Sequence, residues 1–177
     1  MGKYVGIISK SNIWGVDFLI LITLGTQDKK FYRLLEAVQS QIDKKNIKDR
    51  VVVQAGCSSD FKSTDMEIFD LIPMDEFDKL IEQCDVLITH GGVGTIITGL
   101  KNNKKVIAAA RLQKHGEHVN DHQLQIIENF TNAGYILSLD NFDELDKVLN
   151  KVKKFKPKKY KSNTAKFINI LEEEIKN

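Results

Sequence analysis

Short apolar runs alternate with amphipathic segments along most of the chain. Phe18–Leu24 (FLILITL) is a nearly continuous apolar run that ends at a glycine, and Lys29–Ile42 then places apolar residues at helical spacing. The same alternation recurs downstream. It predicts five strands, at Phe18–Leu24, Val51–Gln54, Asp85–Thr89, Lys105–Ala110 and Tyr135–Leu139. It predicts six helices, at Lys29–Ile42, Asp75–Cys84, Thr95–Asn102, Val119–Asn132, Asn141–Val152 and Thr164–Lys176.

The predicted strands are almost unbroken apolar runs rather than alternating polar and apolar residues. Such strands are buried on both faces, which is typical of a parallel sheet covered by helices on either side. The pattern therefore predicts an α/β fold with a Rossmann-like, doubly wound parallel sheet. A length of 177 residues fits one such domain.

The limits of this alternation divide the chain into three segments. Residues 1–17 form an N-terminal extension, and their glycines leave open whether they add an edge strand or a flexible arm. Residues 18–155 form the Rossmann-like domain. Residues 156–177 comprise a basic linker and a C-terminal helix.

Composition and cysteine content narrow the class of protein. Hydrophobic residues make up 42% of the chain, close to the range of globular domains, which excludes disorder as the main state. Cys57 and Cys84 form no CxxC pair, so they build neither a disulfide framework nor a four-ligand zinc site, and we expect two buried thiols. The apolar runs are too short for a membrane-spanning helix and the first residues lack a signal-peptide core, so we expect a cytoplasmic location.

Charge is balanced over the whole chain but not along it. The 26 Lys and Arg residues face 24 Asp and Glu residues, so the chain lacks the positive field of a nucleic-acid-binding protein, and we expect no nucleic-acid partner. Seven lysines nevertheless crowd residues 151–161, around Pro157. They form either a solvated linker or a patch near anionic lipid head groups, where each would contribute about 1 kcal/mol.

Two glycine turns follow predicted strands. Residues 25–27 (GTQ) follow the first strand, and residues 90–95 (HGGVGT) follow the strand Asp85–Thr89 and open a helix. Ligands of an open parallel sheet bind beyond the carboxyl ends of its strands. Glycines let the backbone approach an anion, and the first amides of a helix attract phosphate. The two turns favour a diphosphate site over glycines that merely make tight turns.

Two common nucleotide-binding motifs are absent. A dinucleotide fingerprint needs G-x-G-x-x-G at the first helix, but Ile97 stands where the third glycine should be, and the turn lies on a late strand. A Walker A loop is excluded because the chain contains no G-x-x-x-x-G-K-[ST] sequence. The remaining hypothesis is a nucleoside diphosphate held by short glycine turns.

A dense polar cluster at residues 111–123 follows the strand Lys105–Ala110. His115, His118 and His122 could form a zinc site with Glu117 or Asp121, but the loop places them poorly on one shared face. The cluster could also serve only as a polar surface and helix cap, with Asn120 or Asp121 at the N-cap.

Binding of a sugar is the interpretation of this cluster that we favour. Asp121, His122 and Gln123 would bond to paired sugar hydroxyls, while Arg111 or Lys114 would offset negative charge.

Three stretches resemble, in order and spacing, the C-terminal domain of glycosyltransferase family 28. They are FLILITLGTQDKKFYRLL, DVLITHGGVGTI and KVIAAARLQKHGEHVNDHQLQIIENF, and G-E-H-x-x-D-H-Q is the most specific part. The resemblance covers residues 18–139 and is greatest to the stand-alone subunits of two-part enzymes that build capsular and exopolysaccharides. It implies the C-terminal half of a GT-B fold that binds a UDP-sugar and transfers a hexose or N-acetylhexosamine, with inversion, to a polyprenyl-diphosphate-linked acceptor.

The same resemblance implies a heterodimer at the inner face of the membrane. A membrane-anchored partner would supply the acceptor lobe, and the reaction would need neither a metal nor a cofactor. The implied donor-binding residues lie in the two turns and the polar cluster: Gly25, Thr26, Gln27, His90, Gly91, Gly92, Gly94, Thr95, Arg111, Glu117, His118, Asp121, His122 and Gln123.

Two positions depart from the pattern of the family. Thr98 stands where single-chain relatives carry a glutamate that binds ribose, and Ala109-Ala110-Arg111 replaces a common V-P-R. The general base would come from the partner, and the candidates within this chain are His90 and His118.

Two other functions remain open. The chain could be a non-catalytic regulatory subunit that binds a nucleotide sugar, or a self-sufficient transferase whose acceptor site lies between copies. A subunit that needs a partner should show an apolar patch near the sugar-binding edge.

Overall fold

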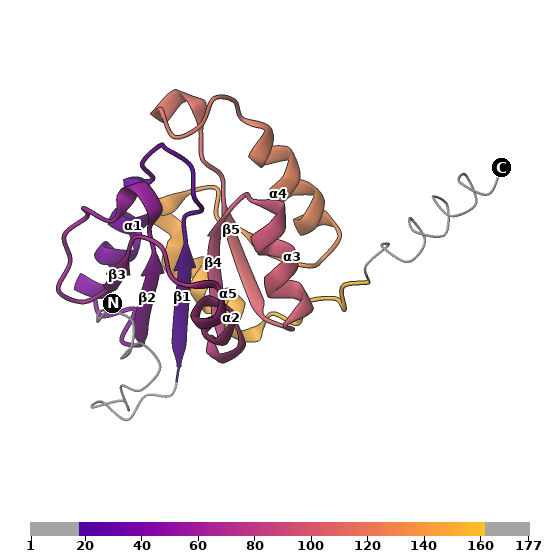
Figure 1. Ribbon diagram of the computed structural model, residues 1–177. Helices are drawn as coiled ribbons and strands as arrows, with labels where there is room; N and C mark the ends of the chain where they lie inside the picture. The colour runs from indigo at the N-terminus through magenta and orange to yellow at the C-terminus, as the bar shows by residue number, and fades with distance from the viewer. Residues whose placement is uncertain (1–17, 162–177) are drawn as a thin grey trace.

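The computed structural model describes residues 18–161, which form one parallel sheet with helices. Neighbouring strands follow the order β3-β2-β1-β4-β5-β6 and all pairs are parallel (Figure 1). The strand order reverses between β1 and β4. The strands are β1 (Leu19–Thr23), β2 (Arg50–Gln54), β3 (Glu67–Phe69), β4 (Val86–His90), β5 (Lys105–Ala109) and β6 (Leu137–Ser138).

Helices connect these strands. The α-helices are α1 (Tyr32–Asp43), α2 (Met74–Gln83), α3 (Val93–Lys101), α4 (His122–Asn132) and α5 (Leu145–Lys154). Within residues 18–161 the single-turn 3₁₀ helices are η1 (Gly56–Ser58), η2 (Gln113–His115) and η3 (Phe142–Glu144).

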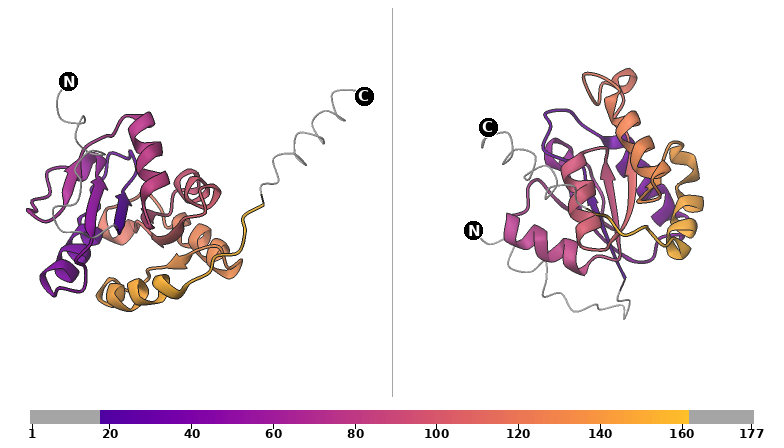
Figure 2. Two further views of the ribbon diagram at one scale, coloured as in Figure 1. Left: turned by 90° about the horizontal axis from the view of Figure 1, so that it is seen from below. Right: turned by 90° about the vertical axis from the view of Figure 1, so that its right-hand side faces the viewer.

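Helices lie on both sides of the sheet and create two hydrophobic cores (Figure 2). The first core joins α1 and α5 to one face through residues such as Leu35 and Leu149. The second joins α2, α3 and α4 to the other face, with Leu80 among its members. Neighbouring residues of one strand enter different cores, Ile20 the first and Leu21 the second. This two-sided burial explains the unbroken apolar runs and confirms the predicted doubly wound α/β fold.

The structure corrects several of the predicted elements. The short strand β3 was missed, and the helix expected from Val119 begins only at His122. The last strand and the helix after it are also shorter than expected, because β6 has two residues and η3 precedes α5. The helix predicted at Thr164–Lys176 and the extension at residues 1–17 lie outside the described residues.

The two cysteines have opposite environments. Cys84 is buried, as predicted, between α2 and β4. Cys57 is exposed, so the prediction of a second buried thiol was wrong. Its position in η1, just beyond the carboxyl end of β2, places it outside the sheet.

No helix within residues 18–161 is both long enough and apolar enough to cross a membrane.

Candidate functional site

The carboxyl ends of β1 and β4 meet where the strand order reverses, which is where open α/β sheets bind ligands. The His90 ring occupies the space between the two glycine turns that start there. A Cβ atom built on Gly25, whose φ is +76°, would lie 2.6 Å from Cε1 of His90. One built on Gly92 would lie 2.4 Å from Nε2 of the same ring. These two glycines therefore make room for a histidine side chain, in addition to shaping the turns.

His90 is neutral at physiological pH. Burial and, to a smaller extent, the positive charge of Arg111 together lower its pKa to about 4. The ring is half-buried and shows a long 3.5 Å contact between its Nδ1 and the Thr89 hydroxyl. A neutral imidazole in this position can accept or donate a hydrogen bond but adds no charge to the site.

The first turn of α3 is the open part of this edge. Gly92 stands at the N-cap of α3 and no side chain caps the helix, so the amides of its first turn are available. A Cβ atom built on Gly94 would meet no atom within 4 Å. Unpaired amides and the positive end of the helix dipole attract an anion. Of the glycines in the two predicted turns, Gly94 is the one that leaves free space beside the backbone.

Arg111 holds two loops together from the inside. Its side chain is 1% exposed and donates to the carbonyl oxygens of Leu24 at 2.6 Å, Lys29 at 2.7 Å and Glu117 at 3.3 Å. The guanidinium lies 5.0 Å from the centre of the Phe31 ring. Burial lowers the pKa of Arg111, while the charge of Glu117 opposes that shift. The β1–α1 loop and the loop after β5 are thus joined by one buried cation.

Glu117 is also bonded within the protein. Its carboxylate accepts two hydrogen bonds from Arg33 of α1, at 3.0 and 2.8 Å, and one from the amide of Leu112 at 3.0 Å. Arg33 also donates to the Ala110 carbonyl oxygen at 3.0 Å and lies 4.0 Å from the Phe142 ring centre. This pair anchors residues 111–117 to α1. No local sequence pattern indicates the role of Arg33, because its partner Glu117 is 84 positions away.

Gln123 joins the β4–α3 turn to the end of β5. Its side-chain oxygen accepts hydrogen bonds from the amides of Gly91 at 3.2 Å and Arg111 at 3.0 Å. A Cβ atom on Gly91 would lie 2.6 Å from Cβ of Gln123, so a glycine is required for this approach. Direct contact between the donor and Arg111 or Gln123 stays a prediction, and both side chains are already bonded inside the protein.

His118 is buried beneath Gln27. The Nε2 atoms of the two side chains lie 2.9 Å apart, and the Asn120 amide donates to Nδ1 of His118 at 3.2 Å. The His118 and His122 ring centres are 4.8 Å apart. His118 is 6% exposed, whereas Gln27 and His122 are exposed. Direct contact between the donor and His118 stays a prediction, and both ring nitrogens already have partners within the protein.

The two residues predicted to cap α4 make different hydrogen bonds. Asp121 occupies the N-cap, but its carboxylate accepts a hydrogen bond from the amide of Gln113 at 2.7 Å instead of capping α4. The Asn120 side-chain oxygen accepts from the amide of His122 at 3.3 Å and also contacts the His122 ring. The exposed Asp121 and His122 side chains therefore stand at the rim of the site.

Three further observations concern the possible metal site, the position of Thr98 and the expected apolar patch. Within residues 18–161 no group of three or more His, Cys, Asp or Glu side chains is arranged to hold a metal ion. The Thr98 hydroxyl donates to the Gly94 carbonyl oxygen at 2.9 Å, so it is bonded to its own helix. Large exposed hydrophobic side chains occur at the start of α3 (Val93), in the first turn of α4 (Leu124) and in the loop before α4 (Val119).

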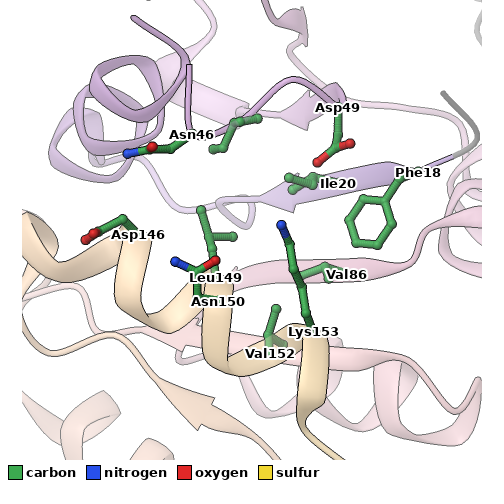
Figure 3. Close-up of a pocket in the computed structure, with 11 residues that line it drawn as sticks. Phe18, Ile20, Asn46, Asp49, Val86, Asp146, Leu149, Asn150, Val152 and Lys153 are labelled. Carbon is green, nitrogen blue, oxygen red and sulfur yellow. The ribbon is translucent and has the colours of Figure 1, made fainter. Parts of the chain in front are cut away.

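A recess lies at the opposite edge of the sheet (Figure 3). It opens to solvent between the amino ends of β1 and β4 and helix α5. Ile20, Val86 and Leu149 form much of its wall, and Asp49 and Lys153 point into it from opposite sides. It contains none of the predicted site residues.

Comparisons with known proteins agree with this architecture. The sequence pattern that defines the glycosyltransferase family 28 C-terminal domain matches residues 19–177. The UDP-N-acetylglucosamine transferase subunit ALG13 of Candida albicans is 32% identical over 90 residues, which are 51% of this chain and 29% of that protein. The chain thus matches less than a third of the length of this curated relative.

Solved structures share the fold at low sequence identity. The glycotransferase of kitacinnamycin superposes with a TM-score of 0.63 at 20% identity, over 86% of this chain and 38% of that one. An NMR structure of ALG13 superposes with a TM-score of 0.55 at 19% identity, over 84% of this chain and 92% of that one.

Proposed function

Because the chain belongs to glycosyltransferase family 28, whose C-terminal domain it carries, we propose that it is the donor-binding subunit of a two-component UDP-sugar glycosyltransferase. The observation that carries this proposal is the open first turn of α3 at the point where the strand order reverses. A diphosphate is the group that free helix amides and a helix dipole stabilise. The name of the Candida albicans relative makes UDP-N-acetylglucosamine the first donor to test.

In this proposal the diphosphate lies above Gly94 at the first turn of α3. The sugar extends toward the rim formed by Asp121 and His122, whose side chains are exposed. An acceptor hydroxyl attacks the anomeric carbon, the bond from that carbon to the UDP oxygen breaks, and the amides of α3 stabilise the negative charge on the departing UDP. No metal or cofactor is required for this stabilisation.

The acceptor and its general base are assigned to a partner. The described residues form one sheet domain, and a GT-B transferase needs two such lobes with the reaction between them. Exposed Val93, Val119 and Leu124 supply apolar surface around the site for a second lobe. We propose a membrane-anchored partner that binds a polyprenyl-diphosphate-linked acceptor, so that this chain acts at the cytoplasmic face of the membrane. His90 is a weak candidate for the base, because its side chain is packed between glycines.

Calorimetric titration of the full chain with UDP and UDP-N-acetylglucosamine tests the proposal. Gly94→Val places a side chain in the free space above α3, so we expect UDP affinity to fall at least tenfold while the unfolding midpoint changes little. Gln125→Val is the matched control, because it adds the same β-branched side chain at an exposed position of α4. Equal UDP affinity in the two variants would overturn the proposed site, and no UDP binding by the unmodified chain would overturn the proposed donor.

The two alternative functions are separated by transfer activity. Asp121→Ala in the reconstituted pair should lower transfer of the sugar if this chain binds the reacting donor. A regulatory subunit would lose control but retain chemistry. Transfer without any partner would identify a self-sufficient enzyme.

A further inference from the structure

The lysine-rich segment at residues 151–161 forms an ordered strip on the surface. Its first residues belong to the end of α5, and the remainder runs over the body of the domain. The amide of Lys158 donates to the Gly134 carbonyl oxygen at 3.0 Å, and the Lys158 stem lies against Gly134. The Tyr160 ring packs edge-on against Tyr135 with 5.6 Å between ring centres. These contacts hold the strip in place although it contains no regular structure after Lys154.

Side chains within the strip are sorted by chemistry. Phe155, Pro157 and Tyr160 are half-buried, and Phe155 and Tyr160 pack against the hydrophobic cores. The lysines are exposed: Lys151, Lys153, Lys154, Lys156, Lys158, Lys159 and Lys161. Lys153 points into the recess that Asp49 also lines (Figure 3). The other six lysines of the strip lie outside this recess and are exposed. The apolar residues of the strip thus fix it to the protein and present a row of ammonium groups outward.

The strip carries the positive charge of a protein that is otherwise acidic. It holds seven of the 26 basic residues and no acidic residue, so the other 19 basic residues are outnumbered by the 24 acidic ones and the rest of the chain carries a net charge of −5. An anionic surface would repel most of the molecule and attract this strip. The charge distribution therefore orients the protein as well as attracting it.

We propose that the strip binds the head groups of anionic lipids. A bilayer surface offers many negative charges in a plane and requires no shaped pocket, which fits an exposed row of flexible lysines. Nucleic-acid binding is less favoured, because the aromatic side chains of the strip are half-buried and cannot serve as stacking platforms for bases.

The strip lies away from the candidate site, so lipid bound to the strip leaves that site accessible. It passes the amino end of β5, where Lys105 donates to the Lys153 carbonyl oxygen at 2.6 Å, and then the turn before β6. It therefore lies on the flank of the sheet next to β6, away from the carboxyl ends of β1 and β4 (Figure 1). This inference does not depend on which donor the site binds.

Co-sedimentation of the full chain with lipid vesicles tests the proposal. We expect binding to vesicles of phosphatidylcholine mixed with phosphatidylglycerol, no binding to phosphatidylcholine alone, and loss of binding near 1 M salt, where the Debye length falls to about 3 Å. A variant with Lys154, Lys156, Lys159 and Lys161 all changed to Gln should bind at least tenfold more weakly, because each lysine contributes about fivefold near an anionic surface.

The matched control removes the same charge from other exposed positions, with Lys44, Lys48, Lys62 and Lys79 all changed to Gln. It should retain most of the binding. Equal losses in the two variants, or equal binding to neutral and anionic vesicles, would overturn the proposal. Binding to RNA or to an acidic protein with none to anionic vesicles would also overturn it. Thermal unfolding of each variant checks that the fold is retained.

Discussion

The two edges of the sheet use polar residues differently. At the carboxyl edge, the side chains of Arg111, Glu117 and Gln123 are buried and form hydrogen bonds with backbone groups of the surrounding loops. At the amino edge, Asp49 and Lys153 line an open recess with apolar walls (Figure 3). Burial raises the pKa of Asp49, and the charge of Lys153 opposes that rise. We therefore place the candidate site at the carboxyl edge, because there buried side chains fix the loops around free helix amides.

The largest expected effect is the loss of Arg111. Arg111→Met would leave three buried carbonyl oxygens without their donor and separate the two loops, at a cost of about 3–5 kcal/mol in the free energy of unfolding. Urea denaturation measures this. The matched variant at the amino edge is Leu149→Ala, which should cost about 2–3 kcal/mol. Only Arg111→Met should also weaken UDP binding, and equal UDP affinity in the two variants would remove the link between this cation and the site.

His90 should make the free energy of unfolding depend on pH through the carboxyl edge. The folded pKa of about 4 lies below the unfolded value of 6.5, so the unfolded chain takes up the proton first as pH falls. The contribution of the neutral ring is complete above about pH 6.5 and is lost toward pH 4, with a total of about 3 kcal/mol. Urea midpoints of the unmodified chain and of His90→Gln between pH 7.5 and 4.5 test this. Parallel curves for the two proteins would contradict it.

Two ion pairs, one at each edge, should differ in strength. Glu117→Gln removes a 5% exposed carboxylate from Arg33 and should cost about 2 kcal/mol. Glu67→Gln weakens the Arg50–Glu67 pair near the amino ends of β2 and β3, whose side chains are 18% and 29% exposed, and should cost about 0.5–1 kcal/mol. Urea denaturation at one pH compares them. Equal costs would mean that burial at the carboxyl edge adds nothing to its ion pair.

The smallest effect concerns the two thiols. Cys57 lies at the carboxyl edge and is exposed, so a disulfide reagent should modify it within the mixing time of a fast assay. Cys84 lies before β4 at the other edge, and burial raises its pKa to about 12, so it should react only after unfolding. The absorbance of the released thiolate gives the number of cysteines that react in the native protein and the number that react after unfolding. Fast modification of two thiols in the native protein would contradict the burial of Cys84.

The sequence contained enough information for the fold because burial leaves a local signal. Phe18–Leu24 and Asp85–Thr89 are apolar on both faces, and such runs identify central parallel strands. Strand β3 gave no such signal, since its three residues are only half-buried. The positions of the two glycine turns and the polar loop after predicted strands indicated where a site could lie, and the family resemblance added the donor-binding roles of their residues, which stay predictions.

The roles of individual side chains at the site could not be predicted in the same way. The acceptors of the Arg111 side chain include Leu24 and Lys29, which are 87 and 82 positions away, so no local pattern indicates them. The glycines show the same limit. Gly92 and Gly94 are equivalent in the sequence, but one lies against the His90 ring and the other borders free space.

Titration of the ¹⁵N-labelled chain with UDP, followed by amide chemical shifts, shows which edge of the sheet binds the nucleotide. We expect the largest shifts on Val93, Gly94 and Thr95, while the amides around the recess at Ile20 and Leu149 stay unchanged. Shifts centred on the recess, or none at the first turn of α3 under saturating UDP, would contradict it.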